Sequence, residues 1–233
     1  MKKNSKAIFQ TLSDYIFPRN CYGCEVRLEF YEKHLCLNCQ IQLPLTLFHQ
    51  TTENPLFQKL SNRFPTESAT SLFYFEKEGV LAHLIHLFKY NGVKEIGVFL
   101  GSWLGDHLKE SAMTADLDAI VPVPLHTVKK RKRGFNQSEL IAKALSKKTK
   151  LPLLSEVLIR VKNTTALAQL GETERELEVR NAFELNIKYS DQPMHLLLVD
   201  DVLTTGATLT ACASALLKNS KIKISIAVLA CRL

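Results

Sequence analysis

The sequence predicts an α/β fold in which helices flank a parallel sheet, with a small N-terminal metal-binding module. Apolar runs of strand length alternate with segments of helical period, and four of the six cysteines form two CxxC pairs. The chain has 233 residues, of which 46% are hydrophobic, enough for one main domain and an appendage. We expect an N-terminal helix and the metal module at 1–45, a linker at 46–70 and the α/β domain at 71–233.

The first half of the α/β domain is expected to hold one strand and two helices. The strand is a short apolar run at 72–75. The next segment, 81–90, carries apolar residues at 81, 84, 85 and 88, which is a helical spacing, and Asn91 with Gly92 ends it. A second helix is expected at 98–108, and a short one at 56–60 within the linker.

The second half of the domain alternates strands with helices. A strand at 118–123 runs into two prolines, so the chain must leave the sheet there. A loop then leads to a helix at 137–148, with Asn136 as N-cap and Glu139 completing a capping box. The remaining expected elements are strands at 157–161, 194–199 and 222–230, a polar loop at 162–175, and a helix at 208–217. This alternation is typical of a parallel sheet.

The charge balance favours phosphorylated or polyanionic partners. The chain has 30 Lys and Arg residues against 23 Asp and Glu residues, a formal charge of +7. Polar residues interrupt the apolar character of residues 1–17, so no secretory signal is expected. No run approaches the roughly 18 apolar residues of a membrane span. We therefore expect a cytoplasmic protein that is not integral to a membrane.

Four cysteines form the two CxxC pairs, Cys21 with Cys24 and Cys36 with Cys39. Each pair can place two thiolates on one metal, and two pairs complete the tetrahedral four-sulfur site of structural zinc. In a cytoplasmic protein this pattern indicates a metal rather than disulfides. A redox dithiol pair and an iron–sulfur cluster are the alternatives. His34 could replace one cysteine, although a surface position without a metal role is the simpler interpretation.

The most informative stretch is LLLVDDVLTTGATL, residues 196–209. An apolar strand ends in Asp200 and Asp201, and a loop of small and hydroxyl residues leads into a helix. Paired carboxylates suit the vicinal hydroxyls of a ribose, and N–H groups at a helix N-terminus suit a phosphate. The alternative is an acidic strand end before a capped helix that binds nothing. The expected phosphate-binding residues are Thr204, Thr205, Gly206, Ala207 and Thr208.

This whole pattern resembles the PRPP-binding motif of type I phosphoribosyltransferases, where PRPP is phosphoribosyl pyrophosphate. The resemblance implies that Asp200 and Asp201 anchor the ribose and that one of them could act as a catalytic base. Mg²⁺ is expected to accompany PRPP, bridging its pyrophosphate and ribose hydroxyls and held largely through water and ligand oxygens.

A basic run, KKRKR, occupies residues 129–133. Arg131 and Arg133 are the expected contacts to the pyrophosphate of PRPP, because guanidinium groups bind phosphate oxygens through two parallel hydrogen bonds. The alternatives are a solvated surface loop, and a loop that follows a DNA backbone while Phe135 stacks on a base. A second candidate DNA surface is the cysteine module, through Tyr22, Arg27 and Phe30.

Four segments in order resemble the ComF family of competence proteins: FPxxCxxC…CxxC, LIHLFKYNG, VPVPLH…RKRGFNQSELIAKAL and LLLVDDVLTTGATL. They span nearly the whole chain. The resemblance implies a phosphoribosyltransferase-like fold with an attached zinc finger, and PRPP binding. It also implies a role in natural transformation, in which members help incoming single-stranded DNA after it crosses the inner membrane.

The family resemblance implies no acceptor for a phosphoribosyl group, so whether the chain is an enzyme stays open. The alternatives are an active Mg-dependent phosphoribosyltransferase of nucleotide metabolism, and a scaffold whose zinc module docks a competence helicase or recombination protein. The chain also departs from the family pattern R-x-x-x-T-x-x-Q-x-x-L-x-x-x-x-R-x-x-N. Arg160 and Thr164 fit it, but Leu167 stands in place of Gln and Glu178 in place of Asn. This region corresponds to the mobile loop over the active site, so the resemblance supports phosphate binding more than catalysis.

Overall fold

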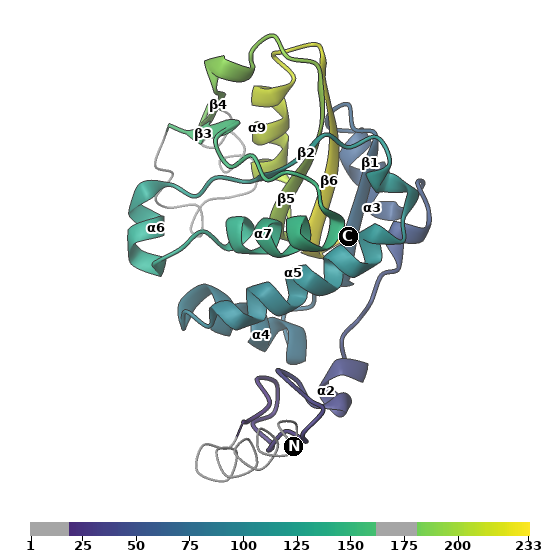
Figure 1. The fold of residues 1–233 in the computed structure, drawn as a ribbon, viewed down its shortest axis with the longest axis vertical. Helices are drawn as coiled ribbons and strands as arrows, with labels where there is room; N and C mark the ends of the chain where they lie inside the picture. Colours follow the sequence, from purple (N-terminus) through teal and green to yellow (C-terminus); the bar gives the residue numbers. More distant parts are fainter. Residues whose placement is uncertain (1–18, 162–180) are drawn as a thin grey trace, which may run out of the picture.

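The computed structural model describes residues 19–161 and 181–233, and its centre is a parallel sheet (Figure 1). Its four strands lie in the order β1-β6-β5-β2, and each neighbouring pair is parallel. This confirms the predicted α/β class. The strands are β1 Ser68–Tyr74, β2 Ala119–Pro122, β5 Met194–Leu203 and β6 Ile222–Cys231.

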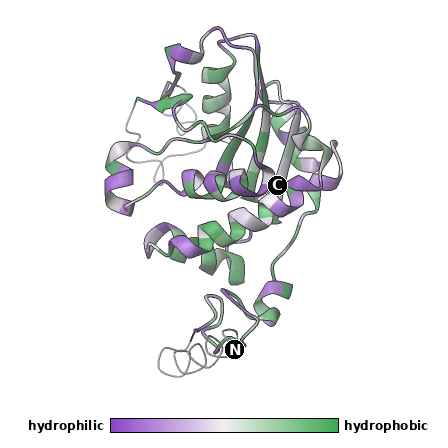
Figure 2. Cartoon of the chain, viewed as in Figure 1, coloured by the Kyte–Doolittle hydropathy of each residue, from purple (hydrophilic) through white to green (hydrophobic). Residues whose placement is uncertain are grey.

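Helices cover both faces of the sheet, because successive strand residues point to opposite sides. Leu197 and Val199 of β5 belong to one hydrophobic core, with α4 (Val80–Tyr90), α5 (Lys94–Lys109) and α7 (Gln137–Thr149). Leu196 and Leu198 belong to the other, with α3 (Pro55–Ser61) and α9 (Ala207–Leu216). In Figure 2 the central strands are mostly hydrophobic, whereas α6 (Thr127–Arg133) is hydrophilic. The other elements are α2 Leu37–Ile41, η1 Phe48–Gln50, η2 Ala112–Thr114, β3 Leu158–Arg160, β4 Phe183–Leu185 and η3 Ile187–Tyr189.

The helical spacings of the sequence are confirmed. All four apolar residues at 81, 84, 85 and 88 of α4 are buried. Asn136 caps α7, because its side-chain oxygen accepts a hydrogen bond from Ser138 N at 3.2 Å. The capping box is incomplete, since Glu139 pairs with Lys130 instead, at 3.3 Å.

Residues 46–70 contain the expected short helix, α3, and much of this stretch packs in the core. The side chains of Leu56 and Leu60 are fully buried between α3 and the sheet. Asn54 ties the stretch to β1, since its side chain caps α3 by accepting from Phe57 N at 3.0 Å and donates to Ala69 O at 2.8 Å. The division of the chain into three parts stays a prediction.

Two local predictions were wrong, and one strand pair was missed. The basic run was expected to lie in a loop but forms α6, which His126 caps and Gly134 ends with a φ of 80°. Strand β5 was expected to stop before its acids but continues to Leu203, since β6 runs beside it as far as Cys231. The antiparallel pair of β3 and β4 was missed as a pair, because β4 has only three residues. The loop expected at 162–175, with Leu167 and Glu178, lies outside the described residues.

Helix α5 packs closely against its neighbours through glycine. A Cβ built on Gly101 would lie 2.9 Å from the carbonyl oxygen of Ile141 in α7, and one on Gly97 would lie 2.3 Å from the Phe88 ring. The contact of Gly101 is with backbone, which cannot rotate away. A side chain at residue 101 would therefore push α5 and α7 apart.

We predict that Gly101→Ala destabilises the protein by about 1–3 kcal/mol, because overpacking outweighs the gain of roughly 1 kcal/mol in helix propensity. Urea unfolding followed by circular dichroism measures this. Val98→Ala, at a position 46% exposed on the same helix, is the control and should change stability by less than about 0.5 kcal/mol. A Gly101→Ala variant as stable as the control would show that α5 and α7 can separate freely.

Candidate functional site

The two acids lie at the carboxyl edge of the sheet, where β5 extends beyond β2. The last residue of β2, Pro122, pairs with Val199, whereas β6 accompanies β5 as far as Leu203. Asp200 and Asp201 are therefore supported by the sheet on one side only. On the other side, the ends of helices α4 and α7 supply their partners.

Asp200 is held by hydrogen bonds in a desolvated position. The hydroxyl of Ser138, in the first turn of α7, donates to its Oδ1 at 2.8 Å, and the backbone N–H of Asp201 donates to the same oxygen at 2.9 Å. Burial, and secondly the neighbouring charge of Asp201, raise the pKa of Asp200 to about 6. A carboxylate with a pKa near 6 is suited to exchanging protons near neutral pH.

Asp201 forms an ion pair with a lysine from α4. Lys89 Nζ lies 3.0 Å from Asp201 Oδ2, and both side chains are largely buried, at 19% and 12% exposed. The ammonium group also lowers the pKa of Asp200 through its charge, against the larger effect of burial. This contact joins α4 to the motif that the sequence singled out.

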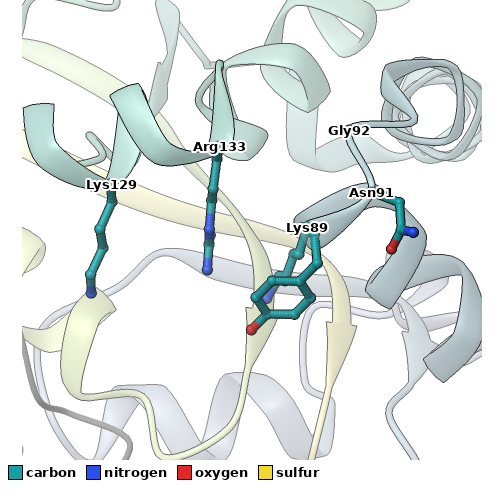
Figure 3. A pocket seen from close by; sticks show the side chains of 6 residues that line it. Lys89, Asn91, Gly92, Lys129 and Arg133 are labelled. Atoms are coloured by element: carbon teal, nitrogen blue, oxygen red, sulfur yellow. The ribbon is translucent and has the colours of Figure 1, made fainter.

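Lys89 also lines a cleft of about 360 Å³ between the end of α4 and helix α6 (Figure 3). Lys129 and Arg133, one turn apart on α6, project in the same direction there, on the side of the cleft opposite α4. The Arg133 guanidinium lies 5.5 Å from the centroid of the Tyr90 ring. The remaining lining residues are Asn91 and Gly92.

The cleft has the electrostatics of an anion site. Burial, followed by the charges of Arg160 and Arg133, lowers the pKa of Lys129. Burial also lowers the pKa of Arg160, against the opposing charge of Asp200. No acidic side chain in the described ranges forms an ion pair with Lys129. A bound anion would relieve this repulsion between cations.

The two arginines predicted to contact pyrophosphate lie in different surroundings. Arg133 lines the cleft and donates to Gln137 Oε1 at 3.2 Å. Arg131 is exposed and is not among the lining residues. Lys129 lies one helical turn before Arg133 and lines the cleft with it. Because α6 is a helix, residues four apart lie on the same side of it, so Lys129 and Arg133 line the cleft together.

The predicted phosphate loop connects β5 to α9. Gly206 has a φ of 86° and is the N-cap of α9, a conformation that favours glycine. Thr205 Oγ1 accepts from Ala207 N at 3.4 Å, and Thr204 is exposed, while Thr208 is half-buried in the first turn. Lys59 donates to the Thr204 carbonyl at 3.2 Å, and a Cβ on Gly206 would lie 3.7 Å from Arg63 Nη1. Two cations near α3 thus lie beside this loop.

The sequence did not assign roles to several residues at this edge. Lys89 lies in the segment LIHLFKYNG, whose family resemblance was the only indication of its importance. Ser138 and Lys129 also lie in family-like segments, but their contacts depend on how α6 and α7 pack. The residues that the structure adds to the predicted set are Lys59, Arg63, Lys89, Tyr90, Lys129 and Ser138.

The four cysteines of the CxxC pairs form one cluster. Their sulfurs all lie within 4.8 Å of one another, and Cys24 and Cys36 Sγ are 3.6 Å apart. Four sulfurs bound tetrahedrally at ~2.3 Å from zinc would be ~3.8 Å apart. The spacing therefore fits, and the cluster could hold a metal ion such as zinc.

Backbone hydrogen bonds favour the thiolate of Cys21, whereas burial and hydrogen bonds with the neighbouring thiols raise the pKa of Cys39. Gly23 N and Cys36 N both donate to Cys21 Sγ at 3.3 Å. Burial raises the pKa of Cys21, but backbone hydrogen bonds outweigh it and lower the pKa to about 7. His34 is not in the cluster; its half-buried ring lies 6.0 Å from the Tyr22 ring and 5.2 Å from the Phe99 ring of α5.

None of the helices in residues 19–161 and 181–233 combines the length and apolar character needed to cross a bilayer. No family model matches the chain. Several curated proteins match it, and three of them are described here. The chain is 29% identical to Competence protein F of Haemophilus influenzae over 216 residues, covering 87% of this chain and 92% of that protein. It is 26% identical to Competence protein ComFC of Bacillus subtilis over 204 residues, 86% of this chain and 79% of that protein.

The DNA utilization protein YhgH of Escherichia coli is 34% identical over a shorter stretch of 149 residues, which is 63% of this chain and 65% of that protein. The relatives named for competence extend the match over most of the chain, and the architecture agrees with the family resemblance: a parallel α/β sheet with a four-cysteine cluster before it. These comparisons support placing the chain with the ComF family.

Proposed function

We propose that this chain acts in competence or DNA utilization, handling incoming single-stranded DNA in the cytoplasm, and that its sheet edge binds PRPP. The cellular role is supported by the names of the relatives, two competence proteins and a DNA utilization protein. The formal charge of +7 also suits a polyanionic partner.

One observation carries the PRPP proposal: three features meet at this edge of the sheet. Asp200 and Asp201 lie near the end of β5, and the loop to α9 follows directly after them. Lys89, the ion-pair partner of Asp201, also lines the cationic cleft. Asp200 and Asp201 would accept hydrogen bonds from the ribose hydroxyls. Residues 204–208 would bind the 5′-phosphate at the N-terminus of α9. Lys129 and Arg133 would bind the pyrophosphate.

Mg²⁺ fits this arrangement as a partner of PRPP. The metal favours phosphate oxygens, water and one or two carboxylates over a complete protein cage. In the described ranges only the cysteines form a protein cluster of three or more metal-binding groups, so the sheet edge has no such cage. The ion would neutralise pyrophosphate charge, and the acids would face its bound waters.

We predict that PRPP with Mg²⁺ binds the full-length protein and that Asp200→Asn combined with Asp201→Asn weakens it at least tenfold. The substitutions keep the shape of both side chains but remove the charges that face the ribose and the metal. Isothermal titration calorimetry measures the affinities. Asp191→Asn, at a side chain 95% exposed, is the matched control. Absence of binding to the wild type would overturn the proposal.

Asp200→Asn alone should stabilise the protein at alkaline pH. Folding raises the pKa of Asp200 from 3.8 to about 6, so this group penalises the folded state increasingly as pH rises through that range. The difference corresponds to about 3 kcal/mol at most, and Asn lacks it. Urea unfolding measures the free energy of unfolding at pH 4 and at pH 8. From pH 4 to pH 8, this free energy should rise by about 1–3 kcal/mol more in the variant than in the wild type. A relative loss at pH 8 would contradict the sign of this pKa shift.

We further propose that the four cysteines hold structural zinc. The purified protein is expected to contain one zinc per chain by elemental analysis, and Cys39→Ser should lose it and melt at lower temperature. His34→Gln should retain the metal, because His34 lies outside the cluster. Iron in place of zinc, or a metal-free wild type, would favour the iron–sulfur or the dithiol alternative.

A second candidate function is phosphoribosyl transfer in nucleotide metabolism. The observation that favours it is Asp200, whose pKa of about 6 suits a general base. Release of pyrophosphate from PRPP and Mg²⁺, dependent on an added base or amine, would establish it. No release with any tested acceptor would leave a binding role.

A further inference from the structure

Tyr90 is an exposed aromatic ring inside a charged cleft. It is the last residue of α4, its side chain is 67% exposed, and it lines the cleft with the cations of α6. The ring has polar neighbours: its centroid lies 5.1 Å from that of His86 and 5.5 Å from the Arg133 guanidinium. Burial in the core therefore does not account for an aromatic residue here.

PRPP by itself does not account for the ring either. The sugar and its phosphates have no planar ring that could stack, so the cations and acids would suffice for them. Lys129 and Arg133 supply charge for a phosphate on the α6 side, and Tyr90 supplies an exposed aromatic ring from the end of α4. Nucleobases stack readily on exposed aromatic rings of this kind. The cleft thus combines the two recognition elements of a nucleotide.

We propose that this cleft binds a nucleoside phosphate, with its base on the Tyr90 ring and its phosphate on Lys129 and Arg133. The volume of about 360 Å³ lies within the range of small-ligand sites. The inference deepens the DNA-handling part of the proposed function, on which it rests. The nucleotide is either one unit of a single strand or a free nucleotide.

The test compares strands with and without bases. Fluorescence anisotropy measures binding of the full-length protein to a labelled oligothymidylate and to an abasic strand of equal length and charge. The wild type should bind the oligothymidylate at least about fivefold more tightly, and Tyr90→Leu should reduce this ratio to near one. Tyr90→Phe should preserve it, because the ring remains. Tyr31→Leu, at a tyrosine 64% exposed on the cysteine module, is the matched control and should also preserve it.

Phosphate contacts are tested separately by salt dependence. Combined Lys129→Gln and Arg133→Gln substitutions should weaken both strands and lower the salt slope, whereas Tyr90→Leu should leave the slope unchanged. Competition by thymidine monophosphate against inorganic phosphate distinguishes the sources. If thymidine monophosphate displaces the labelled oligothymidylate at concentrations similar to those of unlabelled strand, the ligand is a free nucleotide. If only longer strands displace it, the ligand is one unit of a single strand.

Two results would overturn the inference: equal binding of both strands by the wild type, or loss of base dependence in Tyr31→Leu but not in Tyr90→Leu. A parallel PRPP titration of the wild type keeps the proposals separate. If PRPP binds but Tyr90→Leu changes nothing, this inference alone fails. If PRPP does not bind but the Tyr90 effect appears, the PRPP proposal alone fails.

Discussion

The site depends on the unequal lengths of the strands beside β5. Strand β2 ends at Pro122, after which Val123 N makes a last hydrogen bond to Val199 O at 2.9 Å, while β6 continues to Cys231. Asp200 and Asp201 therefore keep the rigid backbone of a strand but have one side open. Because β2 stops, the first turn of α7 and the last turn of α4 contact the acids, through Ser138 and Lys89.

This arrangement joins one acid and one cation of the site in an ion pair and leaves other charges desolvated. Among the described residues, Lys89 pairs with Asp201, Asp200 accepts hydrogen bonds from Ser138 and from the N–H of Asp201, and Lys129 lies near other cations. Desolvated charges of this kind oppose folding. A ligand with hydroxyls toward the acids and phosphates toward the cations would relieve both strains.

The sequence predicted those features that are local in the chain. The spacing at 81, 84, 85 and 88 predicted a helix, and all four residues are buried. The motif at 196–209 was visible because strand, acids and loop are contiguous. Helix α6 was missed because its residues are almost all polar and show no apolar period.

The long-range contacts were beyond reach from the sequence. The ion pair of Lys89 and Asp201 joins α4 to β5, and no local pattern indicates which lysine of the chain meets which acid. The selection of Lys129 and Arg133 required knowing that α6 is a helix. The proposal for Tyr90 rests on its exposure within the cleft, which the sequence does not show.

Helix α4 also connects the cysteine cluster to the site. A Cβ on Gly23 would lie 2.8 Å from Cys39 Sγ and 3.1 Å from Val80 Cγ1, so the cluster packs against the first residue of α4. The other end of this helix carries Lys89 and Tyr90. Leu28 and Leu35 of the cysteine module share a core with Leu81 and Ile85 of the same helix. A metal that orders the cluster would therefore also support α4, the helix that places Lys89 against Asp201. In this way the N-terminal module would stabilise the site at the sheet edge.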